Sequence, residues 1–283
     1  MKKFIAMGLT AVLALSLAAC GGTASQPASS APASQAASEP ASAAASEPAG
    51  AQTIFSVDDL EGKTVGVQLG TTGDTYAQDI EGATVEQYNK FNDAVLALKQ
   101  GKIDAVIIDN EPGKVFDEQN DDIIMLDEDF AVEDYAIALA KDSELTAQFN
   151  EAIATIKENG TLQAILDKYI NGVEGAEGYV TPEGTQYPNG QLTMATNAYF
   201  PPYEYYEGDE IVGIDAEFAK AICDQLGYEL VIEDMEFASI IPAVSSGKAD
   251  FGAAGMTVTE DRLLNADFTD SYCTGIQSVL VLK

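Results

Sequence analysis

Two charged side chains in this sequence are suited to holding a small molecule. The run TVTEDR carries hydroxyl groups at Thr257 and Thr259 and ends in Arg262. The planar guanidinium group of an arginine can hold a carboxylate through two parallel hydrogen bonds, which a lysine does not reproduce. The second charged candidate is Asp109, which directly follows the apolar run AVII. A fixed cation and a fixed anion together can hold a ligand that carries both an acidic and a basic group.

Composition excludes several other kinds of chemistry. The 283 residues contain 14 Lys+Arg against 46 Asp+Glu, a formal net charge of 14 − 46 = −32. A surface that binds nucleic acid needs basic residues, so no nucleic-acid partner is expected. The chain has no histidine, which excludes a Ser-His-Asp hydrolase and a histidine-ligated metal site. Its three cysteines cannot form a disulfide scaffold. We expect neither a metal nor a cofactor.

Short apolar strands that alternate with helices must position these side chains. Residues 64–68 (TVGVQ) predict a buried strand that ends at the turn 70–74, and residues 105–108 predict another that ends at Asp109. Continuous apolar strands between helices are typical of a parallel sheet covered on both faces. In such sheets, ligands bind at the carboxyl ends of the strands. The turn 70–74 and Asp109 are therefore expected at one edge.

A second α/β unit follows the first. The pattern predicts a strand at 135–139, helices at 143–159 and 162–169, and a loop over 171–190 that is rich in Gly, Pro and acidic residues. The chain then alternates again between strands and helices, at 192–196, 215–226, 229–234, 239–246, 249–252 and 276–282. The sequence thus predicts two α/β lobes with a ligand cleft between them.

The N-terminal residues are typical of an exported lipoprotein. Lys2 and Lys3 precede an apolar run at 4–17 that is too short to favour spanning a bilayer, and the run ends in LAAC at Cys20. We expect a signal peptide over 1–19 and a lipid anchor on Cys20 that holds the protein on the extracytoplasmic face of the cell membrane. An ordinary secretory signal followed by a chance cysteine is the alternative. Residues 20–52 are expected to be a disordered Ala/Ser/Pro linker.

Several segments carry a resemblance to a known family. Residues 195–227, 235–262 (MEFASIIPAVSSGKADFGAAGMTVTEDR) and 266–272 resemble the extracytoplasmic amino-acid-binding proteins of ABC importers, solute-binding protein family 3. Residues 56–74 and 101–113 resemble the second lobe of the same family. The resemblance implies a two-lobed periplasmic-binding-protein-like fold of type II.

The order of these segments differs from the family's order. Here the chain starts with lobe 2 (53–134) and enters lobe 1 (135–283) through the helices at 143–169. The N-terminal half of the family lobe follows only afterwards, at 192–283. This resembles a circular permutation with 171–190 as the new join, and an error in gene assembly is the alternative. We expect one covalent hinge strand to be lost, although Ser278–Leu282 could still pair in the sheet, and we expect Lys283 to lie near Phe55 at the hinge.

The resemblance also assigns roles to individual residues. It implies that Arg262, Thr257, Gly255 and the helix start at Thr71 and Thr72 bind the carboxylate of a free amino acid, and that Asp109 binds its ammonium group. It implies that Phe200 and Phe237 enclose the ligand side chain, although both could instead belong to the core. Asn197 stands where binders of cationic amino acids often place an acid, and Gln68 lies near the same pocket. We therefore expect a neutral polar ligand such as glutamine.

These expectations lead to one leading function and two alternatives. The leading one is a monomeric, lipid-anchored binding component that closes on an amino acid and delivers it to an ABC permease, without catalysis. The first alternative is an enzyme on the same fold, such as a cyclohexadienyl dehydratase, which would need a positioned general acid. The second is a binding module that serves a sensor.

Overall fold

The computed structural model describes residues 52–283. The expected signal peptide at 1–19, the lipid-anchored Cys20 and nearly all of the linker at 20–52 lie outside the described residues. Within residues 52–283, no helix is long and apolar enough to cross a membrane.

Lobe 2 is built around a six-stranded sheet with the order β2-β1-β3-β14-β4, in which β5 pairs with β14. Strands β2, β1 and β3 are parallel, as predicted, and β14 is antiparallel to β3. All five residues of β3 are buried, which explains its unbroken apolar run. The strands are β1 (Thr64–Gln68), β2 (Thr84–Tyr88), β3 (Ala105–Asp109), β4 (Ile123–Met125), β5 (Ala131–Tyr135) and β14 (Cys273–Leu282). The helices are η1 (Val57–Leu60), α1 (Thr72–Gln78), α2 (Phe91–Lys99) and α3 (Asn110–Gln119).

Lobe 1 contains a five-stranded sheet with the order β11-β7-β12-β6-β13 and a small sheet with the order β10-β9-β8. The large sheet consists of β6 (Ala138–Leu139), β7 (Gln191–Thr196), β11 (Glu229–Asp234), β12 (Phe251–Gly252) and β13 (Asp267–Phe268). The small sheet consists of β8 (Tyr199–Phe200), β9 (Glu204–Glu207) and β10 (Glu210–Val212). The helices are α4 (Glu144–Glu158), α5 (Thr161–Tyr169), α6 (Ile214–Leu226), η2 (Phe237–Ser239), α7 (Ile240–Ser245) and α8 (Glu260–Leu263). The predicted two-lobed α/β architecture is confirmed.

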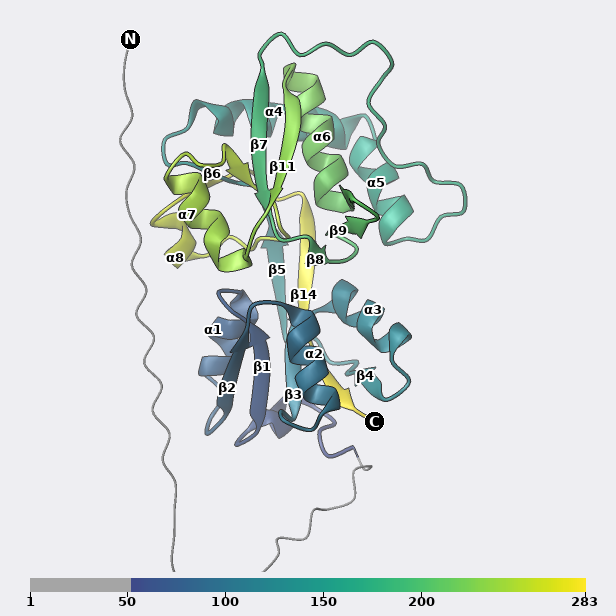
Figure 1. Ribbon diagram of the computed structural model, residues 1–283, viewed down its shortest axis with the longest axis vertical. Coiled ribbons are helices and arrows are strands. Elements are labelled where there is room, and N and C mark those ends of the chain that lie inside the picture. The colour runs from purple at the N-terminus through teal and green to yellow at the C-terminus, as the bar shows by residue number, and fades with distance from the viewer. Residues whose placement is uncertain (1–51) are drawn as a thin grey trace, which may run out of the picture. The chain divides into compact units, whose positions relative to one another are not determined.

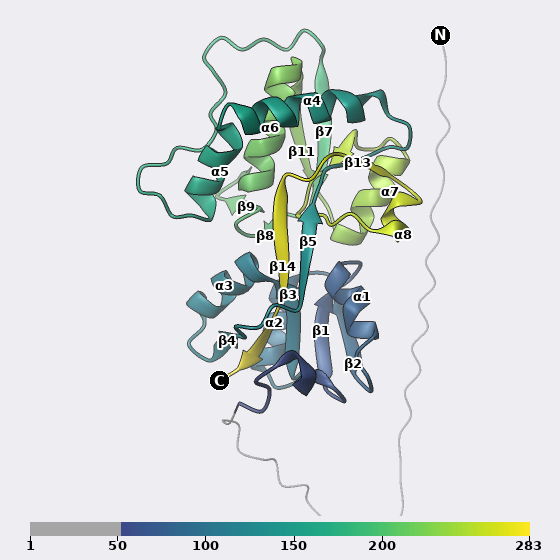
Figure 2. The ribbon, with the colours of Figure 1, turned by 180° about the vertical axis from the view of Figure 1, so that it is seen from behind.

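Two antiparallel strands, β5 and β14, join the lobes (Figures 1 and 2). Glu133 of β5 pairs with Gly275 of β14, and the same β14 continues into lobe 2 beside β3. The expectation that one hinge strand is lost is therefore wrong. Residues 273–282 belong largely to the lobe 2 sheet, although the sequence analysis counted them with lobe 1. The apolar run at 276–282 gave no sign that the strand starts at Cys273 and crosses between lobes.

The two ends of the described chain meet in lobe 2, but not at the hinge. Thr53, Ile54 and Lys283 line one cavity, and the Lys283 amide donates to the Asp122 carbonyl. Leu282 pairs with Ile123 at the end of β14 opposite to the hinge. The two ends are therefore close together, as expected, although Thr53 and Ile54 rather than Phe55 share the cavity with Lys283. The expected position at the hinge is wrong.

Candidate functional site

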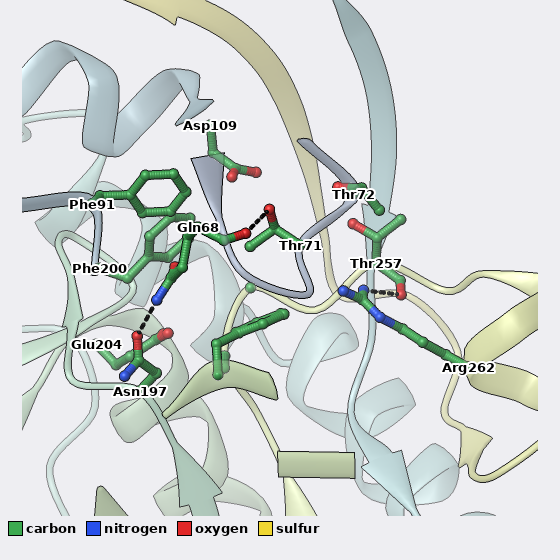
Figure 3. Close-up of a pocket in the computed structure, with 13 residues that line it drawn as sticks. Gln68, Thr71, Thr72, Phe91, Asp109, Asn197, Phe200, Glu204, Thr257 and Arg262 are labelled. Carbon is green, nitrogen blue, oxygen red and sulfur yellow. Dashed lines mark hydrogen bonds between the residues drawn. The ribbon is translucent and has the colours of Figure 1, made fainter. Parts of the chain in front are cut away.

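One cavity between the lobes is lined by all ten residues that the sequence analysis placed in a ligand site (Figure 3). The space between its lining atoms, including the part that is open to solvent, is about 320 Å³. Four of these residues come from lobe 2 and six from lobe 1. They are Gln68, Thr71, Thr72, Asp109, Asn197, Phe200, Phe237, Gly255, Thr257 and Arg262. Phe91, Glu204 and Ala254 also line the cavity, and the sequence analysis missed them. The ligand contacts of individual residues remain predictions.

Arg262 lies in the last turn of the short helix α8 and extends across the boundary between the lobes. Its Nη1 donates to the carbonyl of Thr257 at 2.7 Å in its own lobe, and its Nη2 donates to the carbonyl of Gly70 in lobe 2 at 3.0 Å. The guanidinium carbon lies 5.3 Å from the centre of the Phe237 ring. No salt bridge found among residues 52–283 involves Arg262. Burial lowers its pKa to about 10, which still leaves the group charged at neutral pH.

Asp109 ends β3 at the lobe 2 side of the cavity and is only 5% exposed. The hydroxyl of Tyr135, on the hinge strand β5, donates to its carboxylate. Burial, followed by the charge of Glu133, raises the pKa of Asp109 to about 8. An arriving cation would favour the ionised carboxylate. Asp109 is therefore suited to an ammonium group, while Arg262 offers the opposite charge.

Glu133 organises the region between these two charges, and the sequence analysis did not identify it. Its Oε2 atom accepts hydrogen bonds from the hydroxyls of Thr72 at 3.0 Å and Thr257 at 2.9 Å, and from Nε2 of Gln277 at 3.1 Å. Its Oε1 atom accepts from the Tyr76 hydroxyl at 2.8 Å. Glu133 thus connects lobe 2, lobe 1 and both hinge strands. The hydroxyl of Thr257, which was expected to contact a ligand, is directed to Glu133 instead.

The turn before α1 is held by Thr71. Its hydroxyl donates to the carbonyl of Gln68 at 2.8 Å and accepts from the Asp74 amide at 3.2 Å, so it caps the helix. The helix begins at Thr72, inside the segment 70–74 that was expected to be a turn. The backbone amides of a first helical turn have no partner within the helix. The cap therefore fixes the orientation of this turn beside the cavity.

Aromatic rings form one wall of the cavity. Phe91 of lobe 2 stacks on Phe200 of lobe 1, with ring centres 5.8 Å apart and an interplanar angle of 27°. Phe200 also stacks on Tyr203, at 5.6 Å, and is 7% exposed. Phe237 faces the cavity from η2. These rings can enclose the apolar stem of a ligand side chain.

Gln68, Asn197 and Glu204 add amide and carboxyl groups to the cavity lining. Nε2 of Gln68 donates across the lobe boundary to Oδ1 of Asn197 at 2.8 Å, and Nδ2 of Asn197 donates to the carbonyl of Met235 at 2.8 Å (Figure 3). Glu204 is 1% exposed, and neither of its carboxylate oxygens has a hydrogen-bond partner. Burial, followed by the charge of the nearby buried Asp215, raises the pKa of Glu204 well above its ordinary value.

The C-terminal third of the chain matches a described protein family. Residues 192–283 match the sequence profile of the bacterial extracellular solute-binding proteins, family 3. The arginine-binding extracellular protein ArtP of Bacillus subtilis is 41% identical over 111 residues, which are 35% of this chain and 44% of that protein. The L-cystine-binding protein TcyJ of Escherichia coli is 35% identical over 121 residues, or 42% and 46% of the two chains.

A solved structure of an ancestral arginine-binding protein bound to glutamine is 43% identical, with a TM-score of 0.28. The match covers 28% of this chain and 36% of that one. The chain spans less than half the length of the curated relatives that it matches. The similarity to the bacterial extracellular solute-binding proteins of family 3 thus lies in residues 192–283, the C-terminal third of the chain.

Proposed function

We propose that this protein captures a free amino acid between its two lobes and delivers it to the permease of an ABC transporter. The observation that carries the proposal is that Arg262 and Asp109, a cation and an acid that a bound cation would ionise, line one cavity from opposite lobes. An amino acid presents a carboxylate and an ammonium group on one carbon, so it would satisfy both. Because the two charges lie on different lobes, the ligand would also hold the lobes together.

The side-chain end of the cavity favours a ligand that ends in N–H donors. The two buried oxygens of Glu204 lack donors, and Gln68 and Asn197 add amide groups. Glutamine, the ligand expected from the neutral Asn197, has such donors. Arginine has more of them, and a cation would also stabilise the ionised form of Glu204. The names of relatives such as the arginine-binding ArtP favour arginine as the second candidate.

A thermal-shift screen against the twenty amino acids tests the function. A ligand at 100 to 1,000 times its Kd stabilises the protein by about 2.7–4.1 kcal/mol. Stabilisation by one or a few amino acids would support the proposal, whereas stabilisation by none would contradict it. Prephenate is included because a shift with prephenate, together with its turnover, would favour the dehydratase alternative.

The choice between glutamine and arginine is tested by Glu204→Gln. If arginine is the ligand, loss of the carboxylate should weaken its binding at least tenfold and leave any glutamine binding within about threefold. Glu207→Gln is a matched control, because Glu207 lies exposed on the same strand as Glu204 and outside the cavity lining. Equal losses for both ligands would contradict a role of Glu204 in selectivity.

We also propose that Cys20 carries the lipid that anchors the protein on the extracytoplasmic side of the cell membrane. The support is the run LAAC after an apolar segment and a cationic start. Cys20→Ser should release the protein from the membrane fraction into the soluble exported fraction. Retention of the variant on washed membranes would contradict the lipid anchor.

We propose, finally, that the chain order is a circular permutation of the family's order. Both crossing strands are intact, and Ile54 and Lys283 line one cavity at the base of lobe 2. Joining these ends and opening the chain within 171–190 would restore the family's order without cutting a strand or helix. We also propose that the protein is a monomer, which analytical sedimentation can test.

A further inference from the structure

A second contact between the lobes lies outside the cavity lining. Nζ of Lys90, in lobe 2, lies 3.4 Å from the centre of the Tyr199 ring, in lobe 1. The next residue on each side forms the stacked pair Phe91 and Phe200. Two consecutive residues of one lobe thus meet two consecutive residues of the other. The phenylalanines line the cavity, and Lys90 and Tyr199 do not.

The position of Lys90 is not explained by its own helix. Lys90 is the N-cap residue of α2, and its side chain makes no capping hydrogen bond. A positive charge is unfavourable at a helix N-terminus, because the helix dipole places partial positive charge there. No salt bridge found in the described part of the chain involves Lys90. A residue that breaks a local rule in this way often has a role elsewhere, and here its contact is the Tyr199 ring.

The ring that receives Lys90 is held in place from behind. The Tyr206 ring packs against Tyr199 with centres 6.0 Å apart, and the Tyr206 hydroxyl donates to Asp234 at 3.3 Å. The other carboxylate oxygen of Asp234 accepts from the backbone amide of Ala198 at 2.9 Å. The contact with Tyr199, and then the charges of Glu236 and Asp234, raise the pKa of Lys90 above its ordinary value. The lysine therefore meets a fixed π-face in an acidic surrounding.

We propose that Lys90 and Tyr199 form a clasp that keeps part of the ligand-free protein in the closed state. The clasp acts at the rim of the cleft, next to the inner Phe91–Phe200 pair, and needs no ligand to form. This inference rests on the proposed function in one respect, namely that closure of the lobes serves to capture the ligand. By populating the binding-competent state in advance, the clasp would tighten binding and slow release of whichever amino acid is bound.

The test measures closure in the full-length protein without ligand. Single-molecule energy transfer is recorded between dyes attached through ketone-bearing amino acids at the exposed positions of Asp121 in lobe 2 and Lys220 in lobe 1. Lys90→Met keeps a long unbranched side chain but removes the charge, and Tyr199→Leu removes the aromatic ring that the charge contacts. Each should lower the ratio of closed to open molecules by about 2- to 30-fold, the range for a cation–π contact. The double variant should be no worse than the stronger single one.

Two matched variants separate the clasp from general effects. Tyr199→Phe keeps the ring and should retain closure. Lys102→Met removes an exposed lysine elsewhere in lobe 2 and should leave the ratio of closed to open molecules unchanged. Unchanged closure in Lys90→Met and Tyr199→Leu would overturn the clasp, as would a ligand-free protein with no closed population. A parallel titration with L-arginine and L-glutamine reports on the proposed function separately. If neither amino acid increases closure, the binding proposal is weakened while the ligand-free comparison still decides the clasp.

Discussion

At the scale of residues, the cavity is notable for ionisable groups that lack a counter-charge within it. Arg262 donates only to two carbonyl groups, Asp109 receives only a tyrosine hydroxyl, and Glu204 receives nothing. Buried charge without a partner destabilises a fold, so such groups often mark the place of a ligand. Their energetic cost makes each of them testable by substitution.

Arg262→Ala should weaken amino-acid binding by about 2–5 kcal/mol, because a buried carboxylate of the ligand would lose its charged partner. Arg262→Lys should recover only part of this loss, since an ammonium group cannot form the paired hydrogen bonds. Isothermal titration calorimetry with the amino acid found in the screen measures both. An affinity that does not change in Arg262→Ala would remove this residue from the site.

Asp109→Asn should raise the stability of the ligand-free protein and abolish tight binding. The pKa of Asp109 is raised from 3.8 to about 8, so between these values the folded state holds a proton that the unfolded state has lost. Stability should therefore fall as pH rises from about 4 to 8, by up to about 1.4 kcal/mol per pH unit for one proton. The asparagine variant lacks this contribution.

The measurement for Asp109 is urea unfolding of both proteins from pH 4 to pH 9. The difference in free energy of unfolding should grow with pH and level off above about 8. In the wild type, affinity for the amino acid should rise over the same interval as the carboxylate ionises. Parallel pH profiles of the two proteins would show that Asp109 is not buried in the neutral form.

At the scale of elements, several of the longer strands and helices were predictable, whereas the shortest strands and the ten-residue helix α3 were not. The strand Glu229–Asp234 was predicted with its observed bounds, and the buried β3 within one residue. Both runs contain enough residues for their hydrophobic pattern to be recognised. The strands β8, β9 and β10 have only two to four residues each, too few to show a period.

The site was predictable only in part for a related reason. The family resemblance identified ten residues that line one cavity, but Glu133 and Glu204 escaped it. Each has acidic or tyrosine residues as neighbours in the sequence, so nothing local distinguishes it from a solvated acid. Their burial comes from tertiary packing, with Glu133 surrounded by Thr72, Thr257 and Gln277.

Gly275→Ala should disturb the hinge and the site together. A Cβ atom at this position of β14 would overlap the ring of Tyr135, which is fully buried and donates to Asp109. Overpacking of this kind costs about 1–3 kcal/mol of stability. Thermal unfolding should show this loss and calorimetry a weaker affinity. Thr274→Ala, next to it and exposed, should stay within about 0.5 kcal/mol of the wild type, and equal behaviour of the two would contradict the packing argument.

At the scale of the whole molecule, the two lobes are linked by two strands. The first strand, β5, leads from lobe 2 into lobe 1, and β14 leads back. Hinge bending about these two strands is therefore open to the protein in the segment order that it has, and it would remain so if the proposed permutation were reversed.

A reordered variant tests this view. Lys283 is joined to Thr53 by a short Gly/Ser linker, and the chain is opened within 171–190. We expect the variant to fold and to bind its amino acid within about tenfold of the original, because no strand or helix is cut. Circular dichroism and calorimetry measure both properties. A variant that folds but fails to bind would contradict the proposed equivalence of the two orders.

The meeting of Ile54 and Lys283 at the base of lobe 2 also has a mechanical consequence. A force applied between these residues enters the protein at neighbouring points at the base of lobe 2. It would detach β14 from Leu282 onward, breaking its hydrogen bonds with β4 and β3 one after another. The load would reach the hinge last, so the cleft would keep its shape while the base of lobe 2 yields.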